Sequence, residues 1–201
     1  MRTVLAFTDA SIANKNYYTH KQERVCGFVF STISKHDQYI QSWRKEFSVA
    51  SKPDSDIHTL ELVAIGLAMH CISSYEVCRF IVFTDSDAAY EAITLNKRTK
   101  VKRFNTILDF AQQYYKRLLD LGFEVSFVLC KSHVNIGEQI HYLINNNDMY
   151  FNKALINNVQ SGNRLVDEYV SFIAKNGNIK KLEPYIDIDL GNGYKPKVIP
   201  S

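Results

Sequence analysis

Four acidic residues, Asp9, Glu61, Asp85 and Asp167, stand in or directly after apolar segments of the sequence. Asp9 and Asp85 each follow a short apolar run, and both runs close with the same Phe-Thr-Asp sequence. Glu61 lies within Leu-Glu-Leu-Val-Ala, and Asp167 lies within Leu-Val-Asp. Carboxylates among core-facing residues are costly unless something neutralises them, and Mg²⁺ prefers carboxylate oxygens. The four acids together predict a divalent-metal site.

Each acid also has a simpler interpretation when it is taken alone. Asp85 precedes a predicted helix and could be its N-cap. Glu61 could face solvent at the edge of a helix, and Asp167 could be an isolated surface acid. The repeated strand ending is harder to explain in this way, because the carboxyl edge of an open α/β sheet is where ligands bind. The combination favours one shared site over four unrelated acids.

Sequence patterns predict the elements that position these acids. Three β-rich segments come first, with the spacing of an antiparallel meander, at residues 3–8, 24–31 and 38–49. Helical spacing then alternates with apolar strands, with helices at 57–75, 86–95, 102–121 and 163–174 and strands at 79–84 and 123–129. This order predicts an α/β fold with a five-stranded mixed sheet, three antiparallel strands and then two parallel strands, flanked by helices.

The composition limits the class of protein. A chain of 201 residues, 46% of them hydrophobic, can bury one sizeable core, so a single domain is expected. The net charge of +3 permits a polyanionic partner. The four cysteines lack the spacing of a zinc knuckle. No segment has the roughly 20 apolar residues of a membrane span, so a soluble, cytoplasmic protein without membrane contact is expected.

The order FTDAS, TLELVAIGLA, FTDSDAAYEAI, VLCKSH and GNRLVDEYV resembles type 1 ribonuclease H, a member of the ribonuclease H superfamily. The resemblance implies a ribonuclease H-like domain at residues 1–175 with an insertion at about 134–160. The glycines and prolines of residues 176–201 predict an irregular tail. It also implies an endonuclease that hydrolyses the RNA strand of RNA/DNA hybrids by a two-metal-ion mechanism. The implied cofactor is Mg²⁺, two ions, for which Mn²⁺ can substitute.

Functional residues follow from the same resemblance, position by position. The family's metal-binding acids match Asp9, Glu61, Asp85 and Asp167, and its mobile histidine, which shuttles a proton or helps the product leave, matches His133. The implied substrate-binding residues are Ser11, Asn163 and, in the basic stretch between two predicted helices, Lys97, Arg98, Lys100, Lys102 and Arg103. Cations there would neutralise phosphates without reading sequence. The simpler alternatives are a capped or core histidine and a solvated loop.

Three features depart from the family pattern. Ile57 and His58 stand where many members have asparagines that contact the hybrid, and Asp87 stands where many have glutamine. The segment 134–160 is longer than the family's loop, so it is expected to act in substrate selection, to dock a protein partner, or to be a surface insertion without a role. Two other functions stay open, a nuclease of the same fold that acts on DNA or structured RNA, and a catalytically silent nucleic-acid-binding module.

Overall fold

The computed structural model describes residues 2–17, 20–33, 39–49, 56–73, 76–176, 186–187 and 197–200. Within these ranges one sheet has seven strands in the order β5-β4-β1-β2-β3-β7-β6. The strands are β1 (Thr3–Ala13), β2 (Glu23–Ile33), β3 (Tyr39–Val49), β4 (Arg79–Thr84), β5 (Glu124–Leu129), β6 (Ile186–Asp187) and β7 (Lys197–Pro200). β1 is antiparallel to β2 and parallel to β4, and β4 is parallel to β5. The predicted mixed α/β arrangement is therefore confirmed.

The predicted number of five strands is wrong. The four strands whose side chains are described, β1, β2, β4 and β5, form a mixed sheet that β3 extends on the antiparallel side. Beyond β3, the described residues add β7 and β6, which belong to the segment predicted to be an irregular tail. An unpaired β3 would leave a row of backbone donors and acceptors exposed, and pairing with β7 satisfies part of that row. Residues 177–185 and 188–196 lie outside the described residues.

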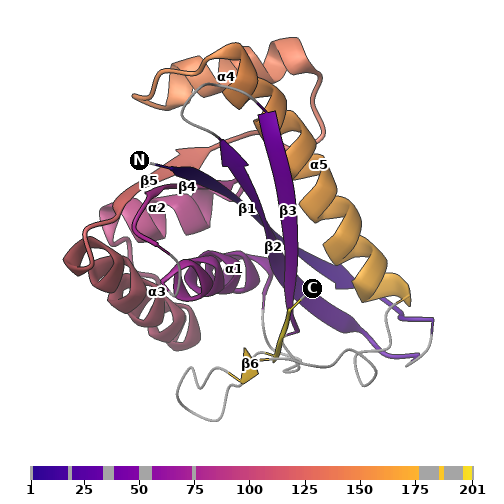
Figure 1. The fold of residues 1–201 in the computed structure, drawn as a ribbon. Coiled ribbons are helices and arrows are strands. Elements are labelled where there is room, and N and C mark those ends of the chain that lie inside the picture. Colours follow the sequence, from indigo (N-terminus) through magenta and orange to yellow (C-terminus); the bar gives the residue numbers. More distant parts are fainter. Residues whose placement is uncertain are drawn as a thin grey trace.

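Helices cover both faces of the sheet (Figure 1). The described helices are α1 (Ile57–Ile72), α2 (Asp87–Leu95), α3 (Lys102–Asp120), α4 (Ile136–Asn146) and α5 (Lys153–Asn176). α1 and α3 lie on one face, α5 crosses the other, and α4 lies at one end of the molecule. Successive strand residues alternate between the two cores, with Val4 and Phe80 packed among residues of α1 and Leu5 and Ile81 among residues of α5. Among the helices of the described residues, none has the length and hydropathy of a membrane span.

Helix α5 begins at Lys153, well before the predicted start at residue 163. Leu155 and Val159 are buried and continue the apolar face that Val166 and Val170 form further along the helix. The polar residues between them hid this face from the sequence pattern. One of these, Asn158, is buried and accepts a hydrogen bond of 3.1 Å from the Ser31 hydroxyl of β2. A tertiary contact therefore allows a polar residue inside the helix's buried face.

Strand β1 continues past its predicted end at Thr8 to Ala13. Its antiparallel partner β2 remains paired with it as far as Ala13, whereas its parallel partner β4 is paired only as far as Phe83, opposite Phe7. Asp9 therefore lies within a strand, just beyond the point where one neighbouring strand departs. This opening in the sheet is where the candidate site lies.

Candidate active site

The register between β1 and β4 brings two aspartates together. Phe7 of β1 pairs with Phe83 of β4, and their rings stack with centroids 4.9 Å apart. Asp9 follows Phe7 by two residues within β1, and Asp85 follows Phe83 by two residues, directly after the end of β4. The two Phe-Thr-Asp sequences therefore lie side by side, and their aspartates lie close together. This part of the sequence-based prediction depended only on parallel pairing in register.

Helix α1 supplies the third carboxylate. The Asp56 carboxylate caps α1 by accepting a 2.7 Å hydrogen bond from the Thr59 N–H, and Glu61 follows in the first turns of the helix. The Ala10 N–H donates both to Asp9 Oδ1 at 2.7 Å and to Glu61 Oε1 at 3.0 Å. One backbone donor therefore serves two acids on different elements.

Asp9, Glu61 and Asp85 form a cluster that could hold a metal ion. Each offers one oxygen, and these oxygens all lie within 4.8 Å of one another. Glu61 is only 5% exposed, and its Oε2 is buried without a hydrogen-bond partner among the described residues. A buried carboxylate oxygen without a partner is costly, and a hard divalent cation is the ligand that three clustered carboxylates accommodate. The residues present therefore fit a divalent metal.

The same crowding raises the pKa values of two of these acids. Burial, with the nearby charges of Asp85 and Asp167, raises the pKa of Asp9 from 3.8 to about 7. Burial and then the charges of Asp9 and Asp85 raise the pKa of Glu61 well above its usual 4.5. These shifts oppose ionisation, and a bound cation would oppose them in turn. Burial and then mutual repulsion of the carboxylates are thus the main electrostatic features of the cluster.

The cluster opens into a cleft of about 370 Å³ that also holds Asp167 and His133. Asp167 lies on α5, outside the group of three clustered oxygens. Its Oδ2 is 3.9 Å from Nε2 of His133, and its Oδ1 accepts a 3.4 Å hydrogen bond from the Ser171 hydroxyl. The exposed His133 has a left-handed backbone conformation (φ 55°), which histidine adopts more readily than most residues. The fourth acid and the histidine therefore face each other across one cleft.

Close packing of α5 against β1 places Asp167 there. A Cβ atom on Gly162 would lie 2.3 Å from the ring of Phe7, so only glycine allows the helix backbone this close to the strand. Ser11 of β1 meets α5 through a 3.4 Å hydrogen bond between its hydroxyl and that of Ser171. Ser11 thus contacts the residue that in turn bonds Asp167.

Asn163 also lines the cleft, but its amide already has a protein partner. Its Nδ2 donates to the Cys130 sulfur at 2.9 Å, and the Cys130 thiol lies 3.2 Å from the carbonyl of Thr84, to which it donates. Burial raises the pKa of Cys130 and keeps it a thiol. All four cysteines are buried and free. No pattern in the sequence signals the link from Cys130 to Asn163.

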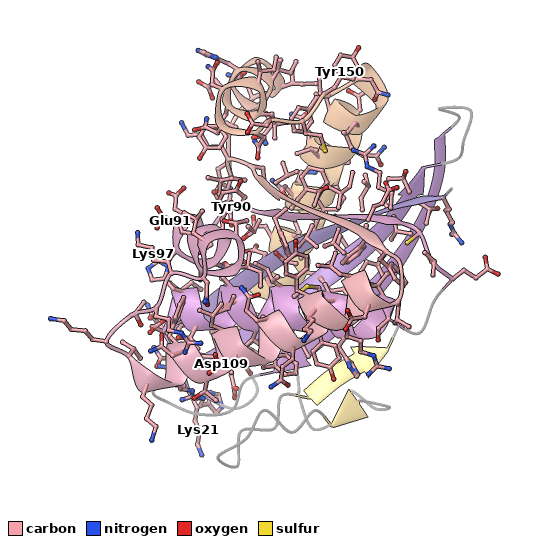
Figure 2. All side chains as sticks on the ribbon, turned by 90° about the vertical axis from the view of Figure 1, so that its left-hand side faces the viewer. Lys21, Tyr90, Glu91, Lys97, Asp109 and Tyr150 are labelled. Atoms are coloured by element: carbon pink, nitrogen blue, oxygen red, sulfur yellow. The ribbon has the colours of Figure 1, made fainter. Side chains whose placement is uncertain are left out.

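The predicted substrate-binding residues of the basic stretch 97–103 do not line the cleft. Lys97 pairs with Glu91 of α2, and Arg98 pairs with Asp109 of α3. Figure 2 shows the side chains of Glu91 and Lys97 beside each other at the edge of the molecule. Lys100 and Lys102 are exposed, and Arg103 is half-buried. The structure therefore separates the predicted basic surface from the carboxylate cluster.

Several polar residues of the cleft were not found from the sequence: Lys131, Gln139, Gln160, Ser161 and Arg164. Gln160 and Arg164 have helical spacing with Asp167. A correct start for α5 would have revealed them, because residues three or four apart share one face of a helix. Gln139 carried no such signal, because it belongs to a helix that the sequence pattern did not predict.

No protein-family model matches the sequence, and no curated protein matches it significantly. The RNase H domain of PFV aligns over 85% of this chain and 93% of its own, with 13% identity and a TM-score of 0.51. The prototype foamy virus protease–reverse transcriptase aligns over 85% of this chain and 20% of its own, with 14% identity and a TM-score of 0.53. RNase H1 from Halobacterium salinarum NRC-1 covers 70% of this chain and 93% of its own, with 13% identity and a TM-score of 0.49.

The two viral matches show the fold and nothing finer at such identities. The chain has a ribonuclease H-like fold, as the sequence resemblance implied.

Proposed function

We propose that this chain is a metal-dependent nuclease that hydrolyses the RNA strand of RNA/DNA hybrids. The observation that carries the proposal is the cluster of Asp9, Glu61 and Asp85, whose oxygens lie within 4.8 Å of one another beside an open cleft. A purely structural cluster would satisfy every buried carboxylate oxygen with a protein donor, whereas Glu61 Oε2 is buried without a partner among the described residues. Their ligand-like geometry supports a catalytic role.

The three clustered acids and Asp167 would hold two Mg²⁺ ions, or Mn²⁺ in their place. Bound divalent cations would stabilise charge on the scissile phosphate and lower the pKa of an attacking water. The Ala10 N–H keeps Asp9 and Glu61 oriented towards the same point. Asp85 completes the cluster from the end of β4.

His133 would transfer a proton at the mouth of the cleft. Its Nε2 lies 3.9 Å from Asp167 and its side chain is exposed, so it can exchange protons with solvent. Imidazole is the side chain whose ordinary pKa suits proton transfer near neutral pH. Asp167 would hold the ring with Nε2 facing the cleft. His133 is thus proposed to protonate the leaving oxygen or assist product release.

Binding of the nucleic acid would use both the cleft and the basic surface. Ser11 and Asn163 lie within or beside the cleft, and Lys97, Arg98, Lys100, Lys102 and Arg103 are proposed to contact phosphates of the second strand. The motifs that resemble type 1 ribonuclease H support the choice of a hybrid substrate. The segment 134–160 is also proposed as a site where a protein partner docks.

The test is hydrolysis of four matched substrates: RNA/DNA hybrid, double-stranded RNA, single-stranded RNA and double-stranded DNA. Each is incubated with Mg²⁺, Mn²⁺ or EDTA, with the unaltered chain and with Asp85→Asn. Asp120→Asn, at an exposed position at the end of α3, is the matched control. We expect metal-dependent cleavage of the hybrid's RNA strand that Asp85→Asn loses and Asp120→Asn retains.

A nuclease acting on structured RNA or DNA is the second candidate. Ile57 and His58 occupy the first turn of α1, and isoleucine cannot make the hydrogen bonds to a hybrid that asparagine makes. Cleavage of another substrate in the same assay, lost in Asp85→Asn, would support this candidate. Binding without cleavage of any substrate would instead indicate a catalytically silent module.

A further inference from the structure

Helix α4 contributes a buried polar side chain to the cleft. Gln139 is only 2% exposed, yet it lines the cleft together with Asp9, Asp85 and Asp167. Its Oε1 accepts a 3.3 Å hydrogen bond from the backbone N–H of Lys131. Its Nε2 is buried and has no hydrogen-bond partner within the described ranges. A donor without a partner among the described residues thus belongs to a side chain that lines the cleft.

The orientation of this amide follows from its one hydrogen bond. A backbone N–H can only donate, so the oxygen of Gln139 must face Lys131 and the nitrogen must point away from it. A buried amide donor that stays unpaired destabilises the protein, and an acceptor that enters the cleft would remove that cost. Gln139 Nε2 is therefore a buried hydrogen-bond donor whose acceptor is absent from the described residues.

Helix α4 is capped at its start and is anchored to the rest of the molecule at its centre and at its C-terminal end. Asn135 caps its start by accepting a 3.0 Å hydrogen bond from the Glu138 N–H. Leu143 is fully buried in the core beneath α5. At its end, Asn147 accepts from the Leu129 N–H and donates to the Leu129 carbonyl, both at 2.9 Å, along the outer edge of β5. α4 is therefore docked on the sheet, which holds Gln139 in a defined place.

We propose that Gln139 Nε2 donates a hydrogen bond to a non-bridging phosphate oxygen of the bound nucleic acid, so that α4 forms a substrate-binding wall of the cleft. The inference rests on the proposed function for the class of ligand. Lys131 and Arg164 line the same cleft and add positive charge, which favours a phosphate over a neutral acceptor. A hydrogen bond of this kind positions the strand without selecting its bases.

Two substitutions separate this role from a structural one. Gln139→Glu keeps an oxygen to accept from Lys131 but removes the amide donor, whereas Gln139→Met removes both without adding charge. Gln113→Glu, at an exposed position of α3, controls for the added negative charge. Dissociation constants are measured by fluorescence anisotropy with a labelled RNA/DNA hybrid in Ca²⁺, and melting temperatures are measured in parallel. This assay needs binding alone, so it can succeed even if the chain cleaves nothing.

We expect both Gln139 variants to bind the hybrid about 10- to 100-fold more weakly than the unaltered chain, with Gln113→Glu unchanged. We expect both variants to melt at a lower temperature, Gln139→Met because the Lys131 N–H loses its acceptor and Gln139→Glu because it buries a carboxylate in a cleft lined by three acids. Unchanged binding by folded Gln139→Met would overturn the proposal, as would an unaltered chain that does not bind the hybrid. If Gln139→Glu does not fold, Gln139→Met decides the result by itself.

Discussion

The carboxylate cluster and the basic stretch 97–103 are both concentrations of one charge, but the structure treats them differently. In the cluster, Glu61 is buried and retains an oxygen without a partner among the described residues, and the pKa values of Asp9 and Glu61 are raised. In the basic stretch, Lys97 and Arg98 are exposed, and each pairs with an acid on a neighbouring helix. Exposed pairs of this kind cost little to form and contribute little to stability.

Charged residues indicate a ligand-binding site most clearly where they are buried without a partner of opposite charge. A buried charge without a partner destabilises the protein, so its presence indicates a ligand that is bound during function. An exposed charge has solvent and counter-ions as partners, so its position alone says little. Three experiments test this contrast between the cluster and the basic stretch.

The largest effect is expected from Glu61→Gln. The amide oxygen can still accept from the Ala10 N–H, but one negative charge is lost from the cluster. Replacing a residue that only orients a metal ligand already costs about 10- to 100-fold, so we expect loss of a direct ligand to reduce hybrid cleavage by more than about 100-fold. The stabilisation by Mg²⁺ in thermal melts should also be lost. Glu76→Gln, an exposed acid before β4, is the matched control, and equal activity of the two variants would contradict the assignment.

A smaller effect is expected in the dependence of metal-free stability on pH. The pKa of Asp9 rises from 3.8 to about 7 on folding, so between about pH 4 and pH 7 the folded chain holds a proton that the unfolded chain has released. Stability in EDTA should therefore fall as the pH rises through this window, and Mg²⁺ should reduce the fall.

Asp9→Asn removes this contribution, together with the part of the Glu61 pKa rise that the Asp9 charge causes. Asparagine cannot ionise, so the variant should melt higher than the unaltered chain at pH 7 in EDTA, by about 2–8 °C for roughly 1–2 kcal/mol. The difference between the two chains should shrink towards pH 4. Other groups, such as His70, whose pKa burial lowers, titrate in both chains and cancel. A difference that grows as the pH falls would show that the sign is wrong.

The smallest effect is expected from the basic stretch. Replacing the exposed Lys100 and Lys102 with alanine should weaken hybrid binding and lower the slope of log affinity against log salt by about one for each phosphate that is no longer neutralised. Lys116→Ala, at an exposed position of α3 outside the basic stretch, should change neither quantity. Salt slopes measured by anisotropy test both statements. An unchanged slope in the Lys100/Lys102 variant would exclude this surface from binding.

Local sequence patterns predicted most of the elements that position the acids. The helix observed at Ile57–Ile72 and the strand at Arg79–Thr84 lie where the pattern expected them, because burial on one face imposes a regular spacing. The pattern failed for the start of α5 and for α4. There, buried polar residues such as Asn158 and Gln139 interrupt the apolar spacing, and their hydrogen-bond partners, the Ser31 hydroxyl and the Lys131 N–H, lie outside these helices.

The amino-acid sequence alone specifies which residues carry charge. It also predicts that Asp9 and Asp85 follow apolar strands and that Glu61 lies on a helix. These are local properties, set by side-chain type and the period of each element. Tertiary packing was needed to establish that Asp167 faces His133, that Asn163 bonds Cys130, that Lys97 is paired, and that β7 continues the sheet beyond β3. Each of these depends on which distant segment packs beside a residue, and a local pattern reports that a residue is buried without identifying its partner.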